Sequence, residues 1–110
     1  MGDITMSKAI HYNPHVIMMI KGRTSNNPIK SSEIERKLHI AGVTVREIVH
    51  RARTVENLPI CSDSKGYYFP MNKLEADKTI RQLRSRAKQL VEAANGIEEY
   101  YITDNQKELF

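Results

Sequence analysis

Polar and basic side chains gather on one face of a helix that the sequence predicts from about Val43 to Arg53. This face carries Gly42, Thr44, Arg46, Glu47, His50 and Arg51. A guanidinium group can pair bidentately with guanine, and a threonine can meet a base edge or the methyl group of thymine. Arg46 and Thr44 are therefore our candidate base readers, and Arg51 is a candidate phosphate contact.

Two helices joined by a short turn would position this face. We expect the first helix to begin at Ser32, because Ser32 and Glu35 have the spacing of a capping box. Residues 39–42 form the predicted turn, with Ile40 as its inward anchor. The second helix should bury an apolar stripe at three- and four-residue steps, made of Ala41, Val45, Ile48, Val49 and Ala52.

A small β-hairpin is predicted directly after the two helices. Leu58, Ile60 and Ser62 alternate along the first strand, and residues 67–69 supply aromatic side chains that suit a return strand. Asp63, Ser64, Lys65 and Gly66 lie between them, and Asp, Ser and Gly are typical turn residues. Lys65 would then lie at the hairpin tip, where we expect it beside a phosphate.

The order of several apolar and turn residues is similar to the winged helix-turn-helix of the biotin operon repressor type. The residues that carry this resemblance span roughly positions 14–70 and are Leu38, Ile40, Val45, Pro59, Ile60, Gly66 and Tyr67. The chain also resembles small phage-encoded DNA-binding proteins that end in a long basic helix. The resemblance implies that the second helix enters the major groove and that Ile29 pairs with the hairpin.

Outside this region we expect three further segments. Residues 1–12 are predicted as an N-terminal arm, because Asn13 and Pro14 suit an N-cap and a first helical position. The predicted winged domain spans residues 13–70. A long helix should occupy residues 71–96, beginning at Asn72 with Glu75 three positions later and ending at Asn95 and Gly96.

The long helix has apolar residues at alternating steps of three and four, which is typical of a coiled-coil seam. The seam residues are Ile80, Leu83, Ala87, Leu90 and Ala94. They predict a homodimer, with packing on the helix of residues 14–20 as the alternative. The cations Lys78, Arg81, Arg84, Arg86 and Lys88 lie mainly off the seam, where they would follow a DNA backbone or solvate the helix.

Residues 97–110 are predicted as an acidic tail. Gln106, Leu109 and Phe110 have the spacing of the Gln-x-x-Leu-Phe peptide that binds the bacterial sliding clamp, which this tail resembles. This resemblance makes the clamp a candidate partner. The alternative is that Leu109 and Phe110 fold back onto the core or pack within a dimer.

Charge and composition narrow the functional classes. One lysine and four carboxylates give residues 97–110 a net charge of −3, which leaves +7 on residues 1–96 of the 110-residue chain. A basic body attracts polyanions, of which nucleic acid is the usual one. Cys61 is the single cysteine, so no intramolecular disulfide forms, and with no apolar membrane-spanning run we expect a location in the bacterial cytoplasm.

No phosphate-cradling glycine loop, zinc-ligand spacing or nucleophilic triad pattern is present in the sequence. We therefore expect no enzymatic activity, no cofactor and no metal. The fold prediction is a mainly α protein with a small β-hairpin wing and a long C-terminal helix. The functional prediction is a phage- or prophage-encoded protein that binds duplex DNA in transcriptional regulation or replication. The alternative is an adaptor or inhibitor that binds a host replication protein such as the sliding clamp.

Overall fold

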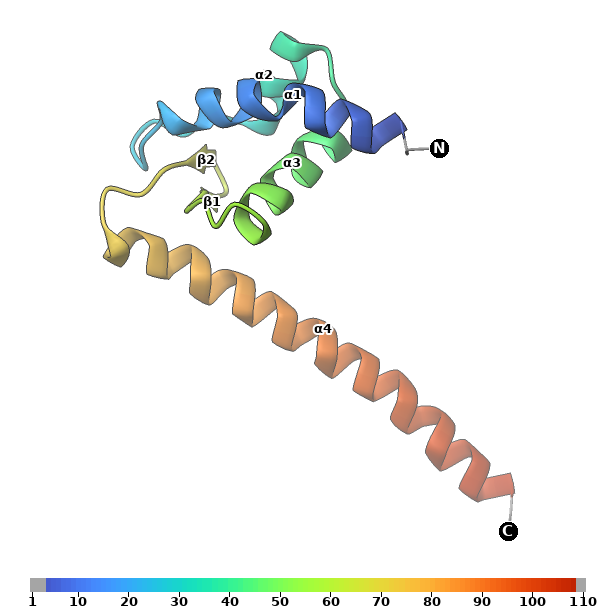
Figure 1. Ribbon diagram of the computed structural model, residues 1–110. Coiled ribbons are helices and arrows are strands. Elements are labelled where there is room, and N and C mark those ends of the chain that lie inside the picture. The colour runs from blue at the N-terminus through green and yellow to red at the C-terminus, as the bar shows by residue number, and fades with distance from the viewer. Residues whose placement is uncertain (1–3, 109–110) are drawn as a thin grey trace. The chain divides into compact units, whose positions relative to one another are not determined.

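A computed structural model describes residues 4–108 of the chain, and the surroundings of side chains for residues 11–103. The chain divides into two units, one up to Ala76 and one from Asp77 onward. The predicted mainly helical fold, with a two-stranded hairpin and a long C-terminal helix, is confirmed. Its elements are α1 (Ile4–Lys21), α2 (Ser31–Leu38), α3 (Gly42–Thr54), β1 (Cys61–Asp63), β2 (Gly66–Tyr68) and α4 (Lys73–Glu108) (Figure 1).

Helix α1 begins at Ile4, so its predicted start at Pro14 is wrong, and residues 4–12 are helical rather than an arm. A proline inside a helix removes one backbone donor and costs roughly 3 kcal/mol. Core packing nevertheless occurs on both sides of Pro14, since Val16 and Ile20 after it are fully buried. Tyr12 packs against the core, and the Asn13 side-chain amide donates a hydrogen bond to Glu56 at 3.3 Å instead of capping the helix.

One apolar core holds the first unit together. Helix α1 packs mainly on α3 and also contacts α2 and β2. Because the three helices and the hairpin each contribute only a few apolar side chains, the core depends on all of them. The buried members are Val16, Ile20, Ile29, Ile34, Ile40, Val45, Ile48, Val49, Ala52 and Ile60.

The α2–α3 connection follows the predicted pattern in outline but not in its caps. Helix α2 begins at Ser31, and the expected capping box with Ser32 is absent because the Ser31 hydroxyl donates to the Glu35 carboxylate at 2.9 Å. His39 takes the left-handed angles of the turn (φ 54°). Ile40 is buried as expected, whereas Ala41 is exposed and does not join the α3 stripe.

The hairpin turn matches the prediction. Asp63 pairs with Gly66 across the strands, and the Asp63 carboxylate accepts hydrogen bonds from the backbone N–H groups of Lys65 (2.7 Å) and Gly66 (3.2 Å). The side chain thus satisfies the donors at the tip, as aspartate does in Asx turns. Lys65 is left exposed at the turn.

A single bridge joins this hairpin to the segment before α2. The Ile29 N–H donates to the Tyr67 carbonyl at 2.9 Å, and the Tyr67 N–H donates to the Ile29 carbonyl at 2.8 Å. The expected pairing of Ile29 with the hairpin is therefore confirmed. Gly66 has φ +144°, and a Cβ there would lie 2.3 Å from the Ile29 carbonyl oxygen. Only glycine allows this close approach.

Helix α4 begins where predicted and ends later. The Asn72 side chain accepts a hydrogen bond from the Glu75 N–H at 3.0 Å, while the Glu75 carboxylate accepts from the Met71 N–H and from the Ser25 hydroxyl. The helix then continues through Gly96 to Glu108, so the predicted end at Gly96 and the separate tail are wrong. A glycine within a helix costs only about 1 kcal/mol, which does not stop a long helix.

Replacing Gly66 by Ala should destabilise the first unit by roughly 2–4 kcal/mol, because the new Cβ meets backbone atoms that cannot move away without breaking the Ile29–Tyr67 bridge. Urea unfolding followed by circular dichroism measures this change. Gly22→Ala is the matched control, since its nearest atom lies at 3.9 Å. Equal stability of the two variants would contradict the close approach at Gly66.

Candidate nucleic-acid interface

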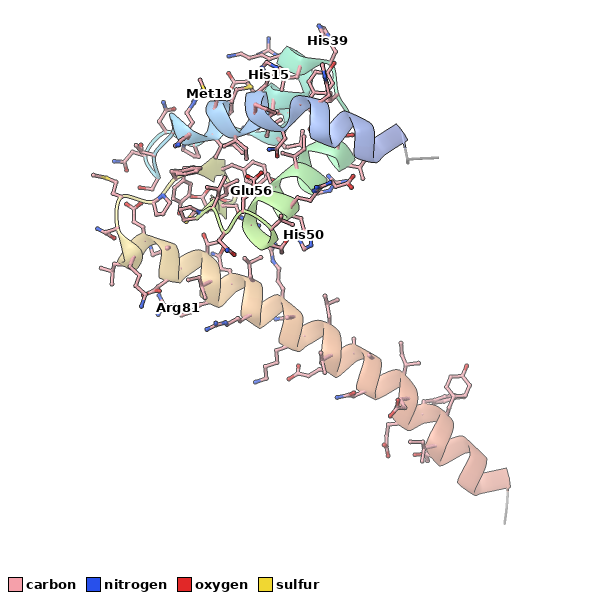
Figure 2. The ribbon with its side chains drawn as sticks, in the orientation of Figure 1. His15, Met18, His39, His50, Glu56 and Arg81 are labelled. Atoms are coloured by element: carbon pink, nitrogen blue, oxygen red, sulfur yellow. The ribbon has the colours of Figure 1, made fainter. Side chains whose placement is uncertain are left out.

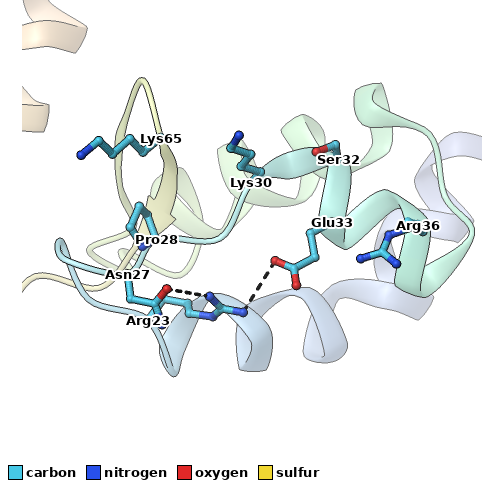
Figure 3. Close-up of a pocket in the computed structure, with 8 residues that line it drawn as sticks. All are labelled: Arg23, Asn27, Pro28, Lys30, Ser32, Glu33, Arg36 and Lys65. Atoms are coloured by element: carbon cyan, nitrogen blue, oxygen red, sulfur yellow. Dashed lines mark hydrogen bonds and ion pairs between the residues drawn. The ribbon is translucent and has the colours of Figure 1, made fainter.

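A hollow of about 670 Å³ lies between the α1–α2 loop, α2 and the hairpin tip. The loop contributes one wall, the first turns of α2 another, and Lys65 reaches it from the hairpin (Figure 3). The residues that line it come from segments up to 42 positions apart and are Arg23, Asn27, Pro28, Lys30, Ser32, Glu33, Arg36 and Lys65.

Four cationic side chains and one carboxylate line this hollow. Arg23 is held within the protein, because its guanidinium lies 3.6 Å from the Glu33 carboxylate and donates to the Asn27 side-chain oxygen at 3.3 Å. Glu33 also pairs with Lys37 at 3.5 Å. Within the described part of the chain, Lys30, Arg36 and Lys65 form no ion pair. The hollow therefore presents uncompensated positive charge to solvent.

Helix α3 presents a second polar surface. Arg46 and His50 are exposed, Glu47 and Arg51 are half-buried, and His50 projects from the helix in Figure 2. These side chains recur at three- and four-residue steps, which places Arg46, Glu47 and His50 on one face of the helix. Arg51 already has an interaction within the protein.

Thr44 does not belong to that surface. Thr44 is only 3 % exposed and so cannot reach a base edge. Its predicted role as a base reader is therefore wrong. Thr44 lies one turn before Ile48, which is fully buried, and helical residues four apart share a face. The buried stripe of α3 is therefore wider than the apolar residues alone indicate.

Arg53 has a positioning role that was not predicted from the sequence. Its Nε donates to the Ile60 carbonyl at 2.9 Å, and its Nη2 donates to the Ser62 hydroxyl at 3.2 Å. Arg53 thereby ties the last turn of α3 to the first strand of the hairpin. Its place in the last turn of α3, where basic side chains can bind backbone carbonyls, was visible in the sequence. The partners of Arg53 could not be predicted, because they depend on the tertiary fold.

The remaining predicted site residues lie on α4 or beyond it. The five seam residues are on α4, where every described side chain from Ile80 to Thr103 is exposed. Arg81 projects from the same helix (Figure 2). Gln106 lies within the helix, but its side chain, like Leu109 and Phe110, is outside the described residues.

The described residues contain neither a membrane-spanning helix nor a metal-binding cluster. Over residues 4–108, no helix is long and apolar enough to cross a membrane, and the described His, Cys, Asp and Glu side chains form no metal-binding cluster. Comparison of the chain with protein-family models, with curated proteins and with solved structures gave no match.

Replacing Arg53 by Ala should lower the free energy of unfolding by about 1–3 kcal/mol, because the Ile60 carbonyl and the Ser62 hydroxyl each lose a charged donor. Chemical denaturation measures the loss. Arg46→Ala removes the same charge from an exposed site on the same helix and should change stability by less than about 0.5 kcal/mol. If both variants unfold alike, Arg53 does not position the hairpin.

Proposed function

We propose that residues 13–70 act as a winged helix-turn-helix and that the chain binds duplex DNA without catalysing a reaction. The observation that carries this proposal is the set of cations around the hollow. Lys30 and Lys65 come from two elements that the Ile29–Tyr67 bridge holds together, and neither has an ion-pair partner among the described residues. Phosphate oxygens are the groups that such cations bind.

In this proposal the two surfaces have different tasks. Helix α3 enters the major groove, where Arg46 reads a base edge and His50 lies further along the same face. Lys65 at the hairpin tip and Lys30 contact phosphates, which positions α3 but carries no sequence information. Glu47 on the same face favours a cytosine amino group or excludes other sequences, since a carboxylate accepts from cytosine N4.

The biological setting belongs to the same proposal. Resemblance to small phage-encoded DNA-binding proteins supports a role in transcriptional regulation or in DNA replication. A basic chain of this size, with a net charge of +4, is suited to searching DNA through its sequence-independent attraction to phosphates.

Replacing Arg46 by Ala should weaken binding to a preferred sequence by about 1–3 kcal/mol more than it weakens binding to random DNA, because a base contact is lost. Replacing Lys65 by Ala should weaken both equally and reduce the slope of log affinity against log salt by about 1. Fluorescence anisotropy with labelled duplexes, after selection of a preferred sequence, measures both effects.

Lys21→Ala is the control for charge alone, because Lys21 is exposed at the end of α1 and does not line the hollow. It should leave binding nearly unchanged. An Arg46 variant that retains full specificity would contradict the assignment of α3 as the reading helix. Absence of any binding by the unaltered protein at low salt would remove the DNA proposal altogether.

A protein-binding role is the second candidate, and the exposed apolar residues of α4 favour it. If the clamp is the partner, deleting residues 106–110 should abolish its capture by the purified protein while leaving DNA affinity unchanged, because the deletion removes the Gln-x-x-Leu-Phe segment only. A pull-down with purified clamp and an anisotropy titration measure the two effects. Unchanged capture by the shortened chain would exclude this segment as the clamp ligand.

A further inference from the structure

Helix α4 displays an exposed apolar stripe along its described residues. Over residues 80–103 every side chain is exposed, including Leu90 at 72 % and Ile97 at 65 %. Most helical stability in proteins comes from burying an amphipathic face rather than from helix propensity. A 36-residue helix with an exposed stripe of this length therefore gains stability by packing that stripe on another surface.

The spacing of the apolar residues in this stripe is suited to packing against another helix. Its members alternate by three and four positions, which is the repeat of a two-stranded coiled coil. Asn95 and Gly96 fall outside this repeat on the opposite side of the helix, so they do not interrupt it. In order, the members are Ile80, Leu83, Ala87, Leu90, Ala94, Ile97 and Tyr101.

Side-chain size distinguishes the two ways in which two copies of α4 can pair. In a parallel pair in register, Ala87 meets Ala87 and Ala94 meets Ala94, so two layers contain only methyl groups. In an antiparallel pair centred on residue 92, Ala94 of one protomer meets Leu90 of its partner, and Ala87 meets Ile97. A large residue then faces each alanine, and alternation of large and small residues fills a core without voids.

The distribution of charge along α4 also favours antiparallel pairing. Residues 77–91 contain five cations and one carboxylate, whereas residues 92–108 contain five carboxylates and one lysine. Antiparallel pairing places the basic half of each helix against the acidic half of the other, and parallel pairing places like charges together. Complementary charges beside the seam determine the orientation of coiled-coil helices.

Size and charge together favour the register centred on residue 92, in which Ile80 meets Asp104 at each end of the paired segment. With the core layers centred on residue 92, the positions that flank the seam on one side pair Arg84 of one protomer with Glu98 of its partner. The positions that flank the seam on the other side pair Arg86 with Tyr100, and a guanidinium over a tyrosine ring is a favourable contact. Shifting the register by one heptad replaces the Arg84–Glu98 pair by Asp77 against Glu98, which is repulsive.

We infer that α4 forms an antiparallel two-stranded coiled coil with α4 of a second copy of this chain. The partner is a second copy because the helix is complementary to itself in both size and charge. The Leu83–Tyr101, Ala87–Ile97 and Leu90–Ala94 layers each occur twice about the two-fold axis. This inference does not depend on DNA binding, since none of these residues belongs to the proposed interface on α3 and the hairpin.

Sedimentation velocity of the full chain tests the pairing. The unaltered protein should be dimeric at micromolar concentrations. Glu98→Arg and Arg84→Glu should each raise the dissociation constant of the dimer about tenfold, because each places like charges together at two symmetric sites. The double variant restores both pairs and should return the constant to within about twofold of the original value.

Glu99→Arg is the matched control, since it makes the same charge change one position away, on the outer face of the helix. It should leave the dissociation constant unchanged. A monomeric unaltered protein, or equal effects of the Glu98 and Glu99 substitutions, would overturn the inference.

Pulsed dipolar electron paramagnetic resonance tests the orientation. With Cys61→Ala as the background, spin labels on Ala93→Cys, which flanks the seam next to the two-fold axis, should lie close together. Labels on Thr103→Cys should lie at least about 33 Å apart, because each is eleven residues from the centre at 1.5 Å per residue. Close labels at both positions would show a parallel pair and overturn the antiparallel arrangement.

Discussion

The two backbone hydrogen bonds between Ile29 and Tyr67 are the constraint on which the first unit depends. They join the segment before α2 to the second strand of the hairpin, and these strands are otherwise too short to be stable alone. The bridge brings two backbones so close that position 66 must be glycine. As a result the hairpin tip, with Lys65, is fixed beside the start of α2 rather than left to move independently.

That constraint also explains where positive charge collects. Arg23 is neutralised by Glu33 and so contributes to the structure of the loop, whereas Lys30, Arg36 and Lys65 are available to an external anion. Arg53 makes a second connection, from α3 to the first strand. The hairpin is therefore tied both to the element that carries Arg46 and to the hollow. This common frame supports the proposal that one DNA duplex contacts α3 and the hairpin together.

Local patterns were sufficient for much of the fold. The stripe of Val45, Ile48 and Val49, the Asp63–Gly66 turn and the Asn72 cap each involve residues within a few positions of one another, and each was predicted correctly. The errors arose where contacts between residues far apart in the sequence determine the structure. Pro14 lies inside α1 rather than at its start, and Thr44 is buried although it is polar. The hollow was not predicted, because it exists only when Arg23, Arg36 and Lys65 are brought together.

The most direct test of the central claim is a titration of the isotopically labelled full chain with duplex DNA, followed by backbone amide resonances. Our account predicts that the largest shifts occur at Lys30, at Arg46 and His50 on α3, and at Lys65 in the hairpin turn, and that they diminish as salt is raised because the contacts displace counterions from phosphates. Shifts absent from both α3 and the hairpin, whether confined to α4 or missing altogether, would contradict it.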